Sequence, residues 1–454
     1  MSDFMRSSDA FTWAMETDPA LRSTIVTLTL LDRAPDWDEV VDRFERLCRN
    51  LPIFRQRVVP SLPPAPPRWE DDQHFDLGFH MRRVSAPAPG DLNALLEMAR
   101  IAAMSDFDRA RPLWEVTLID DLADGGAALL AKLHHSLTDG IGGVQIAMSL
   151  LDVAETPQDR GPMPPERKTK PPLPFDVVID TLRYNAELAG MAASASVKTV
   201  PEMILHGVRR PVQTVRSAGA VAASVYRTVR PIANTGSSLM ARREPVRHLA
   251  VHQVSLPSLR KAGHLGGGSV NDAFLAGVTG GLRRYHEKHG ISVGDLHMTM
   301  PVSIRAEGEA MGGNRITLMR YDLPVGLADP RQRIREIHKR ATKQRNEKSL
   351  PYTQLIAGAM NLMPRWYIGS VLRRVDFVAS NVPGIPVPVY LSGAAVRSQF
   401  AFGPTIGAAV NVTLISYAET CELGINIDTG AIPDYGTFCE CLAGGFDEVL
   451  ELAS

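Results

Sequence analysis

The stretch HHSLTDG, residues 134–140, is the part of this sequence that decides most about the fold. An apolar run, residues 127–133, precedes it and follows the turn signal Asp124-Gly125-Gly126, so we expect a strand that ends at the histidines. After it, residues 140–151 begin as a glycine-rich bend and continue as an apolar helix. A pair of titratable rings at a strand end, held by a tight turn, is well placed to face a cleft.

The composition is that of an ordinary globular protein. Of the 454 residues, 44% are hydrophobic and 22% are charged, and this length is typical of two domains. The net charge of −1 indicates no nucleic-acid partner. Cys48, Cys421, Cys439 and Cys441 form no C-x-x-C pair, which is typical of a reduced, intracellular protein. The sequence predicts neither a secretory signal nor a membrane-spanning helix, so we expect a soluble or peripheral protein.

Residues 1–155 have the pattern of a mixed α/β domain. The β-branched run 23–31 predicts a strand, and the acid-started segment 36–47 predicts an amphipathic helix. A further strand at 114–119 is expected to pair with 127–133 through the intervening Asp-Gly turn.

The segment 156–245 predicts a linker. Its residues 161–174 are rich in proline, and helical stretches follow. From Met203 to Arg243 there are seven arginines and no acidic residue. This basic segment is either a solvated helical bridge or an amphipathic surface that rests on anionic lipid, and its poverty in Trp and Phe favours the bridge.

Residues 246–454 return to a mixed α/β pattern. Strands are expected at 248–254, 295–300, 314–320, 375–380 and 422–428. The fold class is therefore α/β (α+β), with two halves, 1–155 and 246–454, on either side of the linker 156–245.

The sequence argues against a metal site and against a covalent nucleophile at the histidine pair. Adjacent strand residues point to opposite faces, so His134 and His135 can hardly ligate one metal ion, and no third ligand stands at a zinc-motif spacing. No G-x-S-x-G or cysteine-nucleophile signature occurs. We therefore expect one histidine to be a general base on a substrate hydroxyl or amine, with the other packed in the fold. The alternative is that both are ordinary strand-end residues.

Further residues could support such a site. Asp139 can hold the loop by pairing with a cation, for which Arg55 and Arg305 are the candidates. Trp114 is expected to be a core aromatic, and Pro112 to shape the fold beside it.

An S-x-x-D capping box at Ser269 and Asp272 places Asn271 in the first turn of a helix that runs to about Lys288. There the Asn271 carboxamide could donate a hydrogen bond to developing negative charge. The alternative is that Asn271 and Asp272 only cap the helix.

The sequence resembles the HH-x-x-x-D-G acyltransferase superfamily, and within it the bacterial wax ester synthase/diacylglycerol acyltransferase family. Besides residues 134–140, the segments that carry this resemblance are 8–10 with 16–17, 111–114, 269–276, 301–305 with 313–314, 380–384 and 402–404. Where the family usually has Pro-Met-His before its first strand, this chain has Ala20-Leu21-Arg22-Ser23, and Ile385-Pro386 is a slighter variation. The ordered set is specific, whereas HH-x-x-x-D-G alone defines only the superfamily.

The resemblance implies two chloramphenicol-acetyltransferase-like domains in a pseudo-symmetric arrangement, with the site at their junction. It implies that His135 is the base and His134 its packed neighbour, with Asp139, Gly140 and Asn271 also in the site. The reaction would move a long-chain acyl group from acyl-CoA to diacylglycerol or a long-chain alcohol, with no acyl-enzyme and no cofactor. Triacylglycerol or wax ester would be the product. We expect a cytoplasmic protein, with contact with a membrane or lipid droplet as an open alternative.

The sequence leaves three alternative functions. The spacing of His134 and Asp139 also fits the H-x4-D pattern of glycerol-phosphate acyltransferases, but those enzymes usually bring membrane segments. An amide-forming condensation enzyme would normally stand beside carrier domains, for which this chain has no room. A non-catalytic lipid-binding or regulatory protein on an acyltransferase fold is disfavoured by the intact His135, Asp139 and Gly140.

Overall fold

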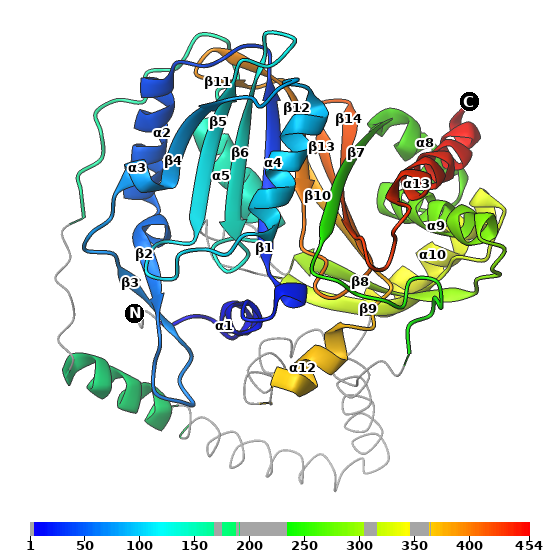
Figure 1. Ribbon diagram of the computed structural model, residues 1–454, viewed down its shortest axis with the longest axis horizontal. Coiled ribbons are helices and arrows are strands. Elements are labelled where there is room, and N and C mark those ends of the chain that lie inside the picture. The colour runs from blue at the N-terminus through cyan, green and yellow to red at the C-terminus, as the bar shows by residue number, and fades with distance from the viewer. Residues whose placement is uncertain are drawn as a thin grey trace, which may run out of the picture.

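The computed structural model describes residues 4–167, 175–187, 190, 234–303, 316–345, 363 and 365–454 (Figure 1). Two six-stranded sheets stand side by side in these residues, one built mainly from each half of the chain. The expected α/β class and the two sheet-rich halves are confirmed.

The first sheet contains the strand that ends at the histidines. Its strands, in order across the sheet, are β11 (Tyr390–Leu391), β12 (Ala394–Phe402), β1 (Thr24–Leu31), β6 (Ala127–His134), β5 (Trp114–Asp120) and β4 (Met81–Ser85). β5 and β6 pair antiparallel, as the sequence predicted, and β6 also pairs antiparallel with β1. The histidine strand therefore lies in the middle of the sheet.

Both faces of this sheet are covered by helices. They are α2 (Trp37–Asn50), α4 (Leu92–Met104) and α5 (Gly140–Leu150). Leu95 and Ala99 of α4 pack on one face with Leu28 and Leu130. On the other face, α2 and α5 share a core with alternate residues of β5. Since side chains alternate along a strand, the residues of β6 divide between these two cores.

The first half also contains several short elements. They are α1 (Ser7–Met15), α3 (Leu77–His80) and the two-stranded sheet of β2 (Gln56–Val59) and β3 (Arg68–Asp71).

The second sheet belongs entirely to the C-terminal half. Its order is β7 (Arg247–Ser255), β14 (Thr420–Asp428), β13 (Val410–Tyr417), β10 (Phe377–Ile385), β8 (Asp295–Ser303) and β9 (Ile316–Pro324). β10 is parallel to both of its neighbours, β13 and β8. All five strands expected in this half are confirmed, while β13 was not expected.

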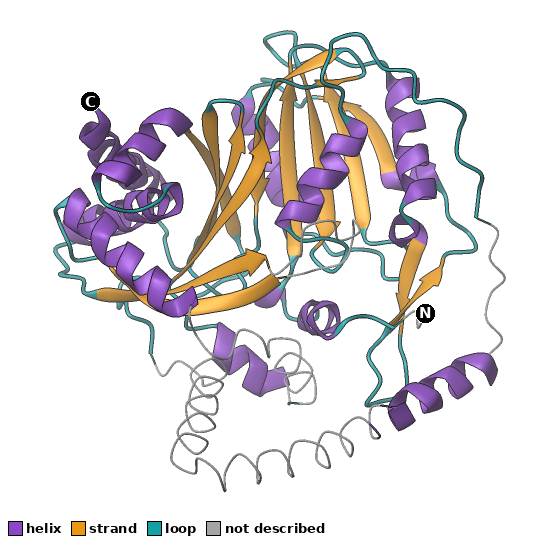
Figure 2. Cartoon of the chain, turned by 180° about the vertical axis from the view of Figure 1, so that it is seen from behind, coloured by secondary structure: helices purple, strands orange, loops and turns teal. Residues whose placement is uncertain are grey.

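Helices gather on the side of the second sheet that is remote from the first sheet (Figure 2). They are α8 (Leu256–Leu265), α9 (Val270–Lys288), α10 (Pro330–Arg345) and α13 (Tyr435–Leu450), and α12 (Arg365–Leu372) lies apart from them. The helix that was predicted to end near Lys288 does end there.

One crossing of the chain links the halves and was not expected. β11 and β12 belong to the segment 246–454, yet they complete the first sheet, where β12 pairs with β1. Phe400 and Phe402 of β12 pack into the core beneath α4. The segment 246–454 is therefore a continuous stretch of sequence that serves both sheets.

The linker 156–245 is described only in part. Arg46 of α2 donates to the backbone carbonyls of Arg160, Gly161 and Pro162, and Arg49 donates to that of Pro164, which holds the start of the linker against the first half. Residues 175–187 form a helix. Of the basic segment 203–243, residues 203–233 lie outside the described residues.

Candidate active site

The segment 134–140 joins β6 to α5. The backbone N–H of His134 donates to the carbonyl of Leu113 over 3.0 Å, and that of His135 donates to the carbonyl of Ser23 over 2.9 Å. Asp139 caps α5, since its carboxylate accepts from the N–H of Gly142 over 2.7 Å. The histidine pair is thus fixed to both neighbouring strands and to the start of a helix.

His134 is completely buried, and both of its ring nitrogens are engaged. Nδ1 accepts from the backbone N–H of Ser136 over 3.1 Å and lies 2.7 Å from its hydroxyl. Because Nδ1 is an acceptor, the ring proton lies on Nε2, which donates to Oε2 of Glu16 over 3.2 Å. His134 therefore has no nitrogen left to take a proton from a substrate.

Glu16 is the acidic partner of this packed histidine. Its Oε2 also accepts from the backbone N–H of Ser23 over 2.9 Å, while its Oε1 is buried. Burial alone would raise the pKa of Glu16, but the hydrogen bonds from His134 and from the Ser23 N–H, together with the nearby Arg22, hold that pKa below the ordinary value. Sequence reasoning gave Glu16 no role, because the two partners are 118 residues apart.

His135 differs from His134 in each of these respects. It follows the last residue of β6, so the alternation of side chains turns it away from the face that holds His134. Part of the residue is accessible, although its Nδ1 is buried and has no hydrogen-bond partner among the described residues. Desolvation lowers the pKa of His135, while its own backbone carbonyl and the charge of Asp139 act in the opposite direction. The ring is therefore neutral near pH 7.

The cation expected for Asp139 stays a prediction. Arg55 lies 2.7 Å from Glu166 and 3.8 Å from Glu45, and its guanidinium stacks over Phe75. It is therefore occupied by acidic groups other than Asp139. Arg305, the second candidate, lies outside the described residues.

Pro112 and Trp114 support the site from the core. Trp114 is 1% exposed, stacks on His80 at 4.5 Å between ring centroids, and donates from Nε1 to the carbonyl of Phe54 over 2.8 Å. Pro112 is buried beside it and accepts from the Trp114 N–H. These residues fix the position of Leu113, whose carbonyl accepts from His134.

Asn271 and Asp272 have separate places at the start of α9. Asp272 is buried and completes a capping box with Ser269, and it also accepts from Nδ1 of His338 over 2.8 Å. Asn271 is partly accessible, and its Oδ1 accepts from Nδ2 of Asn381 over 3.3 Å. The capping role thus falls to Asp272, while the Asn271 amide faces β10.

The two halves meet at Gly140 and β10. A Cβ atom at Gly140 would lie only 2.8 Å from Cγ2 of Val382, so glycine lets the start of α5 approach this strand closely. Val382 follows Asn381, the residue that contacts Asn271. β10 therefore connects the segment 134–140 of one half with the start of α9 in the other.

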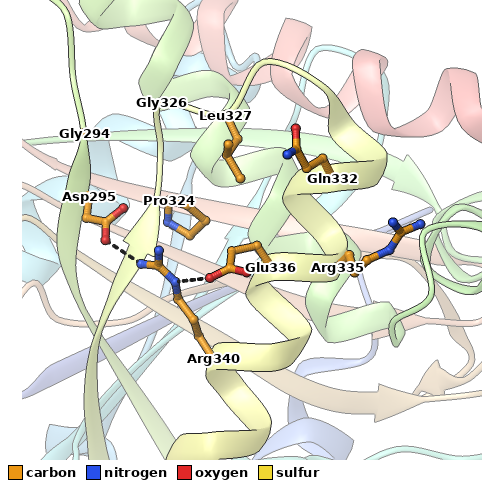
Figure 3. Close-up of a pocket in the computed structure, with 9 residues that line it drawn as sticks. All are labelled: Gly294, Asp295, Pro324, Gly326, Leu327, Gln332, Arg335, Glu336 and Arg340. Carbon is orange, nitrogen blue, oxygen red and sulfur yellow. Dashed lines mark hydrogen bonds and ion pairs between the residues drawn. The ribbon is translucent and has the colours of Figure 1, made fainter.

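Other features of the described residues do not compete with this site. No group of three or more His, Cys, Asp or Glu residues that could hold a metal ion occurs among them. A cavity of about 480 Å³ lies near the start of β8 and beside α10 (Figure 3). Its Arg340 is paired with Asp295 at 2.6 Å and with Glu336 at 3.0 Å. None of the predicted site residues lines it.

Within the described part of the chain, no helix is long and apolar enough to cross a membrane.

Two family models match this chain. The wax ester synthase/diacylglycerol acyltransferase catalytic domain matches residues 5–274, and the C-terminal domain of the same family matches residues 312–449. A putative diacylglycerol O-acyltransferase of Mycobacterium tuberculosis is 37% identical over 100% of this chain and 93% of its own length. A probable diacylglycerol O-acyltransferase of the same species is 26% identical over 97% of this chain and 93% of its own length.

Solved structures show the same fold. The wax ester synthase/diacylglycerol acyltransferase of Marinobacter aquaeolei VT8 superposes with a TM-score of 0.66 at 21% identity, with 100% of both chains covered. The starter condensation domain of rhizomide synthetase, solved with C8-CoA, superposes with a TM-score of 0.61 at 12% identity, covering 100% of this chain and 95% of that one.

Taken together, the fold, the family models and these relatives define an acyltransferase. More particularly, the chain belongs to the wax ester synthase/diacylglycerol acyltransferase family.

Proposed function

We propose that this protein transfers a long-chain acyl group from acyl-CoA to the hydroxyl of diacylglycerol or of a long-chain alcohol, with His135 as general base. The observation that carries the proposal is the contrast within the histidine pair. His134 has both nitrogens engaged, whereas His135 is partly accessible and neutral near pH 7, and its ring forms no hydrogen bond with another side chain among the described residues.

In the proposed reaction, Nε2 of His135 takes the proton of the acceptor hydroxyl as that oxygen attacks the thioester carbonyl. The resulting oxyanion collapses, the carbon–sulfur bond breaks, and the CoA thiolate recovers the proton from the imidazolium. Base catalysis of this kind contributes roughly 10²–10⁴-fold. Asn271, at the start of α9, would donate to the oxyanion.

The proposal includes no acyl-enzyme, and the state of the cysteines supports this. Burial raises the pKa of Cys48, and it raises that of Cys421 to about 12 and that of Cys439 to about 11. A thiol with so high a pKa is protonated near neutral pH and is a poor nucleophile. Ser136, beside the histidines, is completely buried and contacts His134.

The substrate classes are proposed from the relatives. The Mycobacterium tuberculosis relatives are described as diacylglycerol O-acyltransferases, and the Marinobacter protein as a wax ester synthase/diacylglycerol acyltransferase. The rhizomide synthetase domain was solved with an acyl-CoA. Acyl-CoA is thus proposed as a co-substrate, and no cofactor is proposed.

An acceptor panel with one acyl-CoA tests this function. Free thiol released from palmitoyl-CoA is measured with diolein, hexadecanol, a long-chain amine, or no acceptor. We expect release that depends on diolein or hexadecanol, with the matching ester as product. Release that is independent of acceptor, or that occurs with the amine alone, would contradict the proposal, and the latter result would indicate an amide-forming enzyme.

We also propose that the protein contacts a lipid surface at the helix 175–187. Phe175, Val178, Ile179 and Leu182 of this helix are exposed and follow helical spacing, so they form one apolar stripe. The opposite side packs on the protein, where the ring of Tyr184 lies 4.5 Å from that of Phe4. Diacylglycerol is itself a component of lipid surfaces, and such a stripe is suited to rest on one.

A further inference from the structure

Asn381 of β10 is placed to fix the orientation of the Asn271 side chain. The Nδ2 of Asn381 donates to Oδ1 of Asn271 over 3.3 Å. Since this bond occupies the oxygen end of the Asn271 amide, the nitrogen end points elsewhere. Its described neighbour there is the Sδ of Met300, 4.0 Å away. A thioether sulfur is a weak acceptor, so the N–H groups of Asn271 stay available to a stronger one.

The backbone around Asn381 is held firmly. Residues Phe377 to Val382 pair in register with β13, and Asn381 lies opposite Leu414. Shortly after, Gly384 passes so close to β13 that a Cβ atom there would lie 1.8 Å from the carbonyl oxygen of Ser416. The backbone N–H of Gly384 also donates a hydrogen bond to the Ser416 hydroxyl over 3.0 Å. The backbone that carries the Asn381 side chain is therefore paired with β13 up to Val382, after which the register of the pairing shifts.

The neighbouring residue places this strand at the junction of the halves. Val382 packs on Gly140, at the start of the helix that Asp139 caps. Adjacent residues of a strand point to opposite sides, so Asn381 and Val382 reach different partners. One reaches α9 of the C-terminal half, and the other reaches α5 of the N-terminal half.

We propose that Asn381 is a positioning residue that turns the amide of Asn271 so that its N–H groups, and not its oxygen, face the reacting carbonyl. This inference rests on the proposed function, in which Asn271 donates to the oxyanion. The free energy of an amide flip is small unless a neighbour distinguishes oxygen from nitrogen, and Asn381 makes that distinction by donating. Without it, a fraction of the molecules would present the wrong end of the amide.

Steady-state kinetics of acceptor-dependent CoA release in Asn381→Ala, Asn381→Asp and Asn271→Ala, alone and in combination, test this role. Loss of an oxyanion donor costs about 10²–10³-fold in kcat, so we expect a loss of that order in Asn271→Ala. We expect a smaller loss, about tenfold, in Asn381→Ala, with KM for acyl-CoA unchanged, because the amide is then free to turn. Asn381→Asp should lose more than Asn381→Ala, since a carboxylate accepts and would turn the Asn271 nitrogen toward itself.

The combination distinguishes positioning from a structural role. If Asn381 acts through Asn271, adding either Asn381 substitution to Asn271→Ala should cause no further loss in kcat. If Asn381→Asp loses less kcat than Asn381→Ala, or if the losses multiply in the double variants, the inference on Asn381 is overturned. The oxyanion role of Asn271 is not affected by either result. An unimpaired Asn271→Ala would overturn both the inference and the oxyanion role. Asn93→Asp on the exposed side of α4 controls for the added charge, and thermal unfolding of each variant controls for folding.

Discussion

At the residue scale, two adjacent histidines differ because their surroundings differ. His134 donates to a carboxylate and accepts from a backbone N–H, so its tautomer is fixed by the fold. His135 lacks such partners among the described residues and keeps part of its surface accessible. Alternation along a strand predicts that the two rings point to opposite faces. The partner of His134 could not be predicted, since no local pattern connects Glu16 with a residue 118 positions later.

The pH dependence of turnover follows from the His135 environment. Desolvation holds its pKa below the ordinary value of 6.5, so the base is neutral at pH 7 and is lost only on acidification. We expect kcat/KM to be level near neutral pH and to fall with a slope of one on logarithmic axes below pH 6.5. Measurement after return to neutral pH separates this reversible loss from unfolding. An acid limb with its midpoint above 6.5 would count against His135 as the base.

At the element scale, the sequence predicted best those strands that have a regular pattern. The β-branched run of β1 and the apolar run of β6 were found, as was the helix that Ser269 and Asp272 start. β12 was not found, because Arg397, Ser398 and Gln399 interrupt its apolar residues. Two of these three are nevertheless buried, Ser398 at 8% and Gln399 at 9% exposure, because β12 lies between β11 and β1 and near the second sheet.

The helix 175–187 offers a test at the same scale. We expect the protein to sediment with vesicles that contain anionic lipid, and the double variant Phe175→Asp with Leu182→Asp to lose most of this binding, because charge in the stripe opposes insertion. Ile101→Asp on α4 is the matched control, since Ile101 is 56% exposed but lies outside the stripe. Binding that the double variant retains in full would remove the stripe as the contact.

The salt dependence of the same binding reports on the basic segment 203–243, most of which lies outside the described residues. If its arginines rest on anionic headgroups, binding weakens as salt rises. Binding that is insensitive to salt would leave the bridge as the role of that segment.

At the scale of the whole molecule, the site depends on contacts between segments that are far apart in sequence. The motifs at 134–140, 269–276 and 380–384 were each visible in the sequence, but their contacts were not. Gly140 meets Val382, and Asn381 meets Asn271, because β10, a strand of the second sheet, also contacts α5 of the first half. The return of β11 and β12 to the first sheet likewise depends on packing between distant residues. Sequence could therefore name the candidate residues, whereas the structure was needed to group them.

The most direct test of the account is the acceptor-dependent release of CoA from palmitoyl-CoA by the variant His135→Ala. We expect a loss of at least about 10²-fold in turnover, with thermal unfolding near that of the unaltered protein. His264→Ala, which changes an exposed histidine on α8, should retain full turnover. A folded His135→Ala protein that turns over as fast as the unaltered enzyme would contradict the account.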